Sequence, residues 1–294
     1  MQIIEKFSSN SNNEYKFSVV IPSWNNLEYL KLCVKSIQKN SSFKHQIIIH
    51  INEGADGTLE WVKENDFDFT YSKENIGICF PLNFARTLMR TDYYVYMNDD
   101  MYVCPNWDLE LWKEIEKADS NLFFYSSTMI EPYKSLNNCV VAPVDFGTSV
   151  ETFNEERLLN EYKSIEKADW SGATWPPNIV HKDIWDLVGG YSIEFSPGMN
   201  SDPDFSKKLW EAGVRDFRGI GSSKVYHFVS KTTGRIVKNP GRKQFLLKWG
   251  LTSATFTDIV LKRGKKANSL ISEPNSAEYK SQLLKSKIKR FFTF

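Results

Sequence analysis

The sequence YYVYMNDD, residues 93–100, ends an apolar run with two adjacent acids. The run is short, aromatic and free of polar alternation, which is typical of a strand buried on both faces of a parallel sheet. Asp99 and Asp100 repel each other at its end, and a simple turn could use Gly or Asn instead. The two acids therefore need an explanation beyond chain reversal.

Before this strand, strand patterns alternate with helix patterns. Asn25 or Asn26 can cap the first helix, and Pro81 stands at a favoured helix-opening position. The alternation predicts an α/β fold with right-handed crossovers and a mostly parallel sheet flanked by helices. Ligands bind at the carboxyl ends of such strands, where Asn98–Asp100 lie. The expected strands are residues 16–22, 45–54 and 69–72, and the expected helices are residues 27–37, 58–64 and 81–90.

The rest of the chain is less regular. Strand patterns cover residues 122–130 and 224–230, and helix patterns cover residues 154–168 and 202–213. From Gly241 onward the sequence becomes helical and basic. We therefore divide the chain into residues 1–120, residues 121–235 and a helical C-terminal extension, residues 236–294.

Composition excludes several classes of protein. The 294 residues carry a formal net charge of +1, which argues against a nucleic-acid binder. The four cysteines are widely spaced without a metal-binding pattern, which favours reduced thiols and a cytoplasmic protein. The N-terminus shows no signal peptide pattern, and no apolar run approaches the roughly 20 residues that span a bilayer.

The acidic pair has two physical explanations. Mg²⁺ and Mn²⁺ take carboxylate oxygens together with phosphate oxygens and water, so acids at this sheet edge suit a metal-held diphosphate. Alternatively, Asp99 or Asp100 caps a helix that begins near Asn106. The pair taken alone leaves both open.

The order of motifs along residues 17–230 resembles the family 2 glycosyltransferases, which have the GT-A fold. The motifs that carry the resemblance are VVIPSWNN (19–26), INEGADGT (51–58), ENIG (74–77), DYYVYMNDD (92–100), VGGYSIEF (188–195), DPDF (202–205) and VYHF (225–228). The resemblance makes residues 1–120 the donor-binding half and residues 121–235 the acceptor-binding half of one domain.

The resemblance also implies a donor site. Asn98–Asp100 occupies the family's Asp-x-Asp position, with Asp100 as metal ligand and Asp99 by the ribose or diphosphate. Asn52 stands where relatives have a base-contacting Asp. Arg86, one turn beyond Asn83, belongs either to the donor pocket or to an ordinary polar helix face. The other implied donor-binding residues are Pro22, Ser23, Trp24, Asn75, Asn83 and Asn98.

On the acceptor side, the resemblance makes Asp202 the general base. Its alternative role is the N-cap of a helix that opens with Pro203. His227 matches a histidine that contacts the metal or diphosphate, and its alternative is a buried, hydrogen-bonded residue. Trp170 and Trp175 stand near the acceptor site. Trp175 would stack on the face of an acceptor sugar, and its alternative is core packing. The segment SPGMN (196–200) is expected to be a flexible loop able to close over the donor.

These assignments predict an inverting, Mn²⁺- or Mg²⁺-dependent glycosyltransferase. The expected donor is a UDP- or dTDP-sugar, and the expected acceptor is a glycan or lipid-linked hydroxyl in bacterial surface polysaccharide synthesis. A sugar-phosphate nucleotidyltransferase is the first alternative, although PSWNN (22–26) lacks its Gly-rich phosphate loop. A non-catalytic nucleotide-sugar or glycan binder is the second.

The end of the chain, residues 276–294, has an amphipathic pattern after the linker 272–276. This pattern suits an anionic membrane surface, such as the inner face of the membrane, with each basic residue contributing ~1 kcal/mol. Docking onto the protein's own body, or onto a second subunit in a homodimer, is the alternative. The apolar face would be Tyr279, Leu283, Leu284, Ile288, Phe291 and Phe292, and the basic side Lys280, Lys285, Lys287, Lys289 and Arg290.

Overall fold

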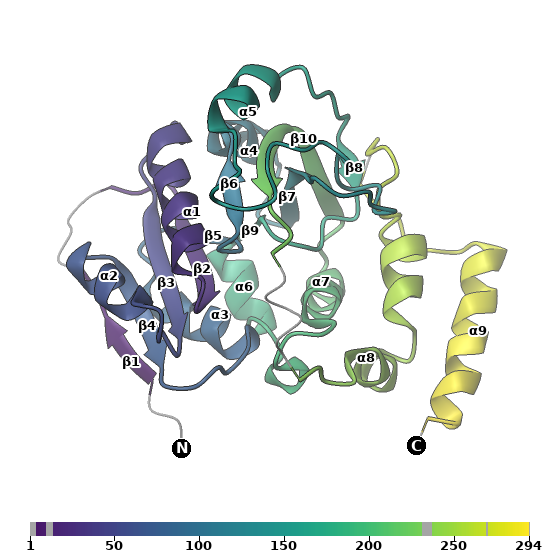
Figure 1. Cartoon of the computed structure of the whole chain (residues 1–294). Coiled ribbons are helices and arrows are strands. Elements are labelled where there is room, and N and C mark those ends of the chain that lie inside the picture. The colour runs from purple at the N-terminus through teal and green to yellow at the C-terminus, as the bar shows by residue number, and fades with distance from the viewer. Residues whose placement is uncertain (1–3, 10–13, 231–236, 269, 294) are drawn as a thin grey trace.

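A computed structural model of the chain describes residues 4–9, 14–230, 237–268 and 270–293. These residues form one ten-stranded sheet with helices on both faces, as Figure 1 shows. The expected α/β architecture is therefore confirmed. The sheet is mixed, because several short strands join its parallel core in antiparallel fashion.

The first part of the chain builds the parallel core. Its elements are β1 (Ile4–Phe7), β2 (Ser18–Trp24), α1 (Leu27–Asn40), β3 (Gln46–Asn52), α2 (Thr58–Glu64), β4 (Asp68–Ser72), α3 (Cys79–Ala85), the short 3-10 helix η1 (Arg86–Leu88) and β5 (Tyr93–Tyr96). β2 pairs in parallel with β3 and β5, and β3 with β4, while β1 adds an antiparallel edge. α3 begins at Cys79, so Pro81 is its third residue and not its first.

The second part adds strands on the other side of β5. Its elements are β6 (Met101–Val103), α4 (Trp107–Glu116), β7 (Phe123–Ile130), α5 (Glu155–Glu161), β8 (Trp170–Ser171), β9 (Asn178–His181), α6 (Lys182–Val188), the 3-10 helix η2 (Ile193–Phe195), α7 (Ser201–Glu211) and β10 (Asp216–His227). The strand order is β1-β4-β3-β2-β5-β9-β7-β10-β6, with β8 paired to β10. β9 lies antiparallel between β5 and β7. The four-residue β9 and three-residue β6 escaped the sequence patterns because both are very short.

The alternating side chains of the central strands supply two cores. Val19 and Ile21 point to one face and pack with residues of α1, α2 and α4. Val20 and Tyr94 point to the other face, where α3, α6 and α7 pack. Burial on both faces explains the continuous apolar runs in these strands. All four cysteines are free and buried, as expected.

The first helix starts differently from the prediction. Asn26 precedes α1 but its side chain makes no capping hydrogen bond. Asn25 has a positive φ of 46°, and its side-chain oxygen Oδ1 accepts a hydrogen bond from the Ala55 amide. The Leu27 amide instead donates to Asp56 Oδ2 at 2.8 Å. A carboxylate from the next βα loop therefore caps α1, which local sequence spacing could not predict.

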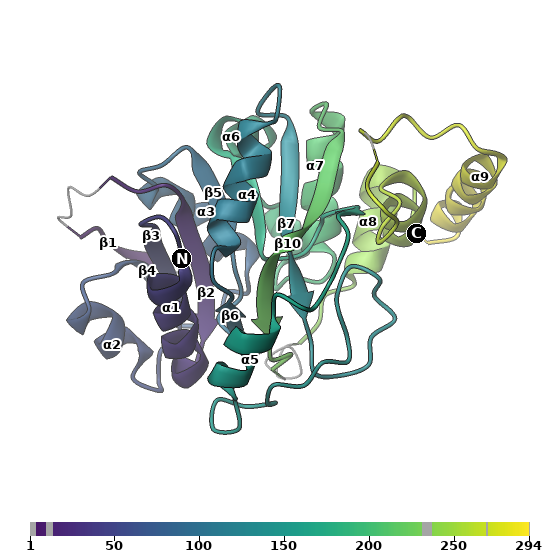
Figure 2. The same ribbon diagram turned by 90° about the horizontal axis from the view of Figure 1, so that it is seen from above.

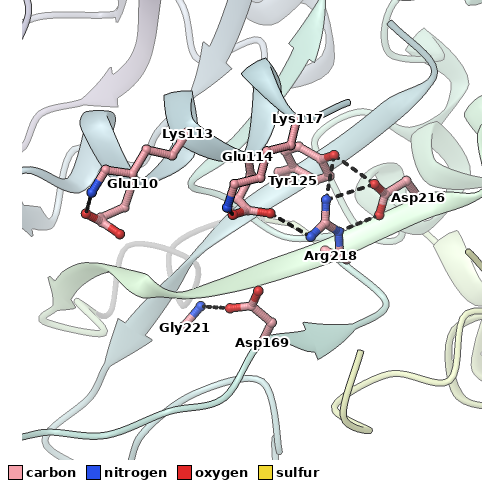
Figure 3. Close-up of polar contacts among 9 residues, drawn as sticks. All are labelled: Glu110, Lys113, Glu114, Lys117, Tyr125, Asp169, Asp216, Arg218 and Gly221. Atoms are coloured by element: carbon pink, nitrogen blue, oxygen red, sulfur yellow. Dashed lines mark hydrogen bonds and ion pairs between the residues drawn. The ribbon is translucent and has the colours of Figure 1, made fainter. Parts of the chain in front are cut away.

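A polar cluster fixes α4 against β7 and β10 (Figure 3). The guanidinium of Arg218 contacts Glu114 at 2.8 Å and Asp216 at 2.7 Å, and the Tyr125 hydroxyl donates to Asp216 at 2.7 Å. Burial and the nearby Asp216 carboxylate raise the pKa of the Tyr125 hydroxyl. These contacts hold the start of β10, whose far end reaches the candidate site.

The C-terminal extension is helical, as predicted. It contains α8 (Gly241–Trp249), the short π-helix η4 (Thr255–Val260) and α9 (Ala277–Phe291), which Figures 1 and 2 place at the edge of the molecule. Asp204 of α7 ties α8 to the main body, since it accepts from Trp249 Nε1 at 2.7 Å and pairs with Lys248 at 2.9 Å. Within the described residues, no helix is long and apolar enough to cross a membrane.

Candidate active site

A pocket of about 450 Å³ opens at the carboxyl ends of β2, β3, β5 and β10. This is the edge at which a sheet with parallel strands is expected to bind ligands. The predicted site residues that line it are Pro22, Ser23, Trp24, Asn52, Asn75, Asn98, Asp99, Asp100, Trp175, Asp202 and His227. The structure thus brings together residues from both halves of the chain, and it leaves Asn83 and Trp170 outside the pocket lining.

The acidic pair lies between β5 and β6, where both side chains are nearly buried. Asp99 Oδ2 accepts a hydrogen bond from the Ser23 hydroxyl at 2.7 Å. Asp100 Oδ2 accepts from the Ser230 amide at 2.7 Å. Neither acid caps α4, because β6 intervenes and Asn106 occupies the N-cap position. The helix-cap explanation of the pair is therefore wrong.

Strand register brings His227 to Asp100. β10 pairs antiparallel with β6 so that His227 stands opposite Met101, the residue after Asp100. His227 Nε2 lies 3.4 Å from Asp100 Oδ1, and its Nδ1 lies 2.9 Å from Glu131 Oε1. Burial lowers the pKa of His227, but Asp100 and Glu131 outweigh it and raise that pKa to about 10. Burial raises the pKa of Asp100, yet His227 brings it below its ordinary value.

The donor set of this pair fits a divalent cation, which would displace the proton that Asp100 and Glu131 stabilise on His227, because only a neutral imidazole binds a metal. A carboxylate oxygen and an imidazole nitrogen face each other in the pocket, and Glu131 can orient the imidazole from its other side, as outer partners of metal-binding histidines do. The described residues contain no cluster of three or more metal-binding side chains. Mn²⁺ or Mg²⁺ held here would therefore complete its shell with ligand oxygens and water, as Mg²⁺ usually does.

The charges of the pocket also favour a cation. Asp99, Asp100 and Asp202 line it, and none of the described lining residues is a lysine or arginine. A diphosphate entering this pocket would meet carboxylates of its own sign. A metal ion between the two would turn that repulsion into attraction.

Asp202 lies in the pocket wall with a strongly raised pKa. Burial raises its pKa to about 7, and a 3.0 Å hydrogen bond from the Tyr191 hydroxyl opposes part of that rise. A carboxylate whose pKa lies near neutrality suits general base catalysis. Asp202 is not the N-cap of α7, because Asn200 holds that position in a left-handed conformation. Its carboxylate is therefore free of the capping role that the sequence left open.

Asn52 and Asn75 shape the donor side through backbone contacts. Asn52 Oδ1 accepts from the Ile76 amide at 2.9 Å, and Asn75 Oδ1 accepts from the Gly77 amide at 2.9 Å. Gly77 has a φ of +78°, and a Cβ there would lie 2.4 Å from the Pro197 Cα. The Ile78 amide donates to the Pro197 carbonyl at 3.0 Å. The loop 196–200 is thus fastened to this turn and forms part of the pocket wall.

Asn83 supports the site from outside. Its amide donates to the Tyr191 carbonyl at 2.7 Å, and its oxygen accepts from the Tyr191 amide at 2.8 Å. A Cβ on Gly190 would lie 2.3 Å from Asn83 Oδ1, so this glycine lets the side chain reach the backbone. The expected direct donor contact of Asn83 is not what the structure shows, since both ends of its amide are engaged with Tyr191.

The expected role of Trp170 needs correction, and Arg86 takes the second of the two roles left open for it. Trp170 is only 4 % exposed, and its Nε1 donates to Thr128 at 2.9 Å, so it packs in the core and does not face an acceptor. Arg86 lies outside the pocket lining and pairs with Asp186 of α6. Trp175 does line the pocket, with the Arg263 guanidinium 5.3 Å from its ring centroid.

Sequence reasoning missed Glu131 and Tyr191. Glu131 follows the last residue of β7, the same kind of position that singled out the acidic pair, and this was the available signal. Tyr191 lies within the VGGYSIEF motif, but its contact with Asp202 depends on how α6 and α7 pack.

Comparisons with known proteins bear on the family and the fold. Residues 18–138 match the model of the glycosyl transferase family 2. No curated protein sequence shows significant similarity to the chain. Among solved structures, S. aureus TarS 1-349 in complex with UDP-GlcNAc is 14 % identical, with a TM-score of 0.54, over 95 % of this chain and 73 % of that one.

Longer proteins also match. The complete S. aureus TarS structure is 13 % identical with a TM-score of 0.56, and the match covers 95 % of this chain but 44 % of TarS. GalNAc-T7 with UDP, GalNAc and Mn²⁺ is 13 % identical with a TM-score of 0.56, over 85 % of this chain and 51 % of that one. At these identities the likeness shows the fold. The chain therefore contains a glycosyl transferase family 2 domain with the GT-A fold.

Proposed function

We propose that this protein is a metal-dependent, inverting glycosyltransferase that moves a sugar from a nucleotide-diphosphate sugar to an acceptor hydroxyl. The observation that carries the proposal is the shared pocket of Asp100, His227 and Asp202. The first two can hold a cation, and the third is a carboxyl whose pKa of about 7 suits a base.

The proposed reaction is one displacement at the anomeric carbon. The acceptor hydroxyl loses its proton to Asp202 while its oxygen forms the new bond to that carbon. The bond from the anomeric carbon to the diphosphate breaks, and the electron pair leaves with the phosphate oxygen. Asp100 and His227 would hold a divalent cation, which would supply Lewis-acid stabilisation of that leaving group. The acceptor oxygen attacks the anomeric carbon from the side opposite the leaving diphosphate. One such displacement, without a covalent enzyme intermediate, inverts the configuration at that carbon.

The donor is proposed to be a UDP-sugar, with a dTDP-sugar as the closest variant. TarS and GalNAc-T7, which share the fold, were solved with UDP-GlcNAc and with UDP and GalNAc. Asn52 and Asn75 fix the turn 75–77 at the donor side of the pocket, next to Trp24. Trp175 offers an aromatic face to a glycan or lipid-linked acceptor, since sugar rings stack on such faces.

Product analysis tests this proposal. The full chain with Mn²⁺ and a panel of UDP- and dTDP-sugars should release nucleoside diphosphate and free sugar slowly, and faster with the correct acceptor. Asp202→Asn should keep donor binding and lose ~100-fold or more in turnover, because an amide cannot take the proton. The surface variant Asp186→Asn is the matched control and should keep full activity.

The same assay separates the alternatives. A nucleotidyltransferase would release pyrophosphate from a nucleoside triphosphate and a sugar phosphate. A non-catalytic binder would bind a nucleotide sugar without releasing any product from it. Either result would contradict the proposal, and so would full turnover by the Asn variant.

A further inference from the structure

α9 meets the rest of the molecule with one face only. Tyr279 and Leu283 pack against the apolar cluster that α7, α8 and η4 share, and Ser286 is buried. The sequence pattern had placed Tyr279 and Leu283 on one surface with four other apolar residues. The structure divides that set, because the docked face uses only these two.

The opposite face of α9 carries apolar side chains that nothing in the described structure covers. Leu284 is 60 % exposed, Ile288 52 %, Phe291 77 % and Phe292 79 %. At 3.6 residues per turn, the first three lie within roughly 60° of one another. Phe294, the last residue of the pattern, lies outside the described residues. Figures 1 and 2 place α9 at the edge of the molecule in both views, so this stripe can meet a flat surface.

Positive charges flank the stripe on both sides. Helical spacing places Lys280 and Lys287 along one border and Lys285 and Lys289 along the other. With Arg290, the helix has five basic residues against the single acid Glu278, a net charge of +4. Among the described residues, no acidic side chain forms an ion pair with any of these lysines. The charge is therefore available to a partner.

We propose that α9 binds the surface of an anionic lipid bilayer. Its apolar stripe would enter the headgroup boundary, and the lysine stems would lie along it with their ammonium groups at the lipid phosphates. A second copy of this chain fits less well, because two such faces would bring lysines against lysines. The site would hold the protein beside its membrane while the pocket stays in water.

Vesicle sedimentation with the full chain tests this proposal. The protein should sediment with mixed phosphatidylglycerol–phosphatidylcholine vesicles and much less with pure phosphatidylcholine, and added salt should weaken the binding. Each basic residue near an anionic surface contributes roughly a fivefold gain in affinity. We therefore expect a loss of at least ~100-fold from the quadruple variant Lys280→Gln, Lys285→Gln, Lys287→Gln and Lys289→Gln.

Matched variants distinguish binding through α9 from non-specific binding of exposed apolar or basic side chains to the vesicles. Leu284→Gln with Ile288→Gln and Phe291→Gln should lose vesicle binding too, whereas Leu187→Gln, an exposed apolar residue of α6, should not. The charge control replaces four exposed lysines elsewhere, namely Lys35, Lys63, Lys262 and Lys266. All variants change exposed side chains, so circular dichroism should show unchanged melting.

Three results would overturn the proposal. The first is no sedimentation of the unchanged protein with the anionic vesicles. The second is equal binding by the α9 variants and their controls. The third is a dimer, detected by analytical ultracentrifugation, that disappears in the apolar variant, since that would make the stripe a contact between subunits.

Discussion

Tyr191 donates its hydroxyl hydrogen to Asp202 Oδ1 at 3.0 Å, while Asn83 holds the backbone of the same tyrosine through two hydrogen bonds. Three separate segments thus fix the direction of one carboxylate: α3, the turn after α6 and the first turn of α7. Asn83 lies outside the pocket, yet it positions Tyr191, whose hydroxyl donates to Asp202.

Replacing Tyr191 by Phe should move the pH dependence of turnover. The hydrogen bond favours the carboxylate, so its loss raises the pKa of Asp202 further above 7. The base must be deprotonated, and activity therefore falls as pH drops through that pKa. Hydrogen bonds to charged groups contribute about 1.5–3 kcal/mol, which predicts an acid limb displaced upward by roughly one pH unit or more. Initial rates measured from acid to alkaline pH would show it.

The control for this variant is Tyr125→Phe, which also removes a buried hydroxyl that donates to a carboxylate, but far from the pocket. It should lower stability without moving the acid limb. A Tyr191→Phe enzyme slowed equally at every pH would mean that the tyrosine has only a packing role.

Asp202→Asn should stabilise the fold relative to the unchanged protein. This gain in stability should be larger at neutral pH than at acid pH. Between the ordinary Asp pKa of 3.8 and the folded value of about 7, the unfolded chain has already lost a proton that the folded chain keeps. Stability of the unchanged protein therefore falls as pH rises through this window, by up to roughly 1.4 kcal/mol per unit. Asn carries no such penalty. The melting temperature of Asp202→Asn minus that of the unchanged protein should grow from pH 4 to pH 7 and then level off.

A constant difference across that range would show that Asp202 does not carry a raised pKa.

Asp100→Ala should abolish metal-dependent nucleotide binding. A diphosphate brought near Asp99 and Asp202 needs a cation, and Asp100 supplies the oxygen ligand that faces His227. Calorimetric titration of UDP with Mn²⁺ should give no binding heat for this variant. A chelator should do the same to the unchanged protein. Unchanged UDP affinity in both experiments would refute the metal site, and Asp186→Ala serves as the control for loss of an acid.

Gly77→Ala should weaken donor binding as well as the fold. The new Cβ would meet the Pro197 Cα at 2.4 Å, so the loop 196–200 must move away from the turn 75–77. Gly213→Ala is the matched control, because Gly213 also has a positive φ (+97°) but nothing within 4 Å of a Cβ. The control should cost ~1 kcal/mol of stability from backbone strain alone. Equal losses in both variants, with unchanged UDP affinity, would show that the close approach has no role.

Much of the fold followed from local pattern. α2 has the predicted bounds, and β5 begins at Tyr93, the first residue of the apolar run quoted at the start. Both follow from the spacing of apolar residues and the polar residues that interrupt it, which are local features of the sequence. The site residues were predicted from their places at strand ends and from the family resemblance. A strand end and a family motif can each be recognised within one short segment of sequence.

What the sequence could not provide was pairing between distant segments. The cap of α1 comes from Asp56, and the partner of His227 on its far side is Glu131. Trp170 stands at a position that the family resemblance places near the acceptor, but it packs in the core, where Gly219 leaves room for its ring. Each of these three contacts depends on strand register or on helix packing. Register and packing leave no periodic signal in the sequence.

β9 arrives late in the chain, yet it lies between β5 and β7, which are both made before it. During synthesis those two strands leave the ribosome with open edges, and such edges readily pair with other chains. The sheet closes only when residues 178–181 are available. A message that stops soon after residue 138 would thus encode the whole family 2 match but yield a protein prone to aggregation, without His227 of the proposed metal site. The ribosome must therefore synthesise the chain as far as β10 before it can fold with all the residues of the proposed site.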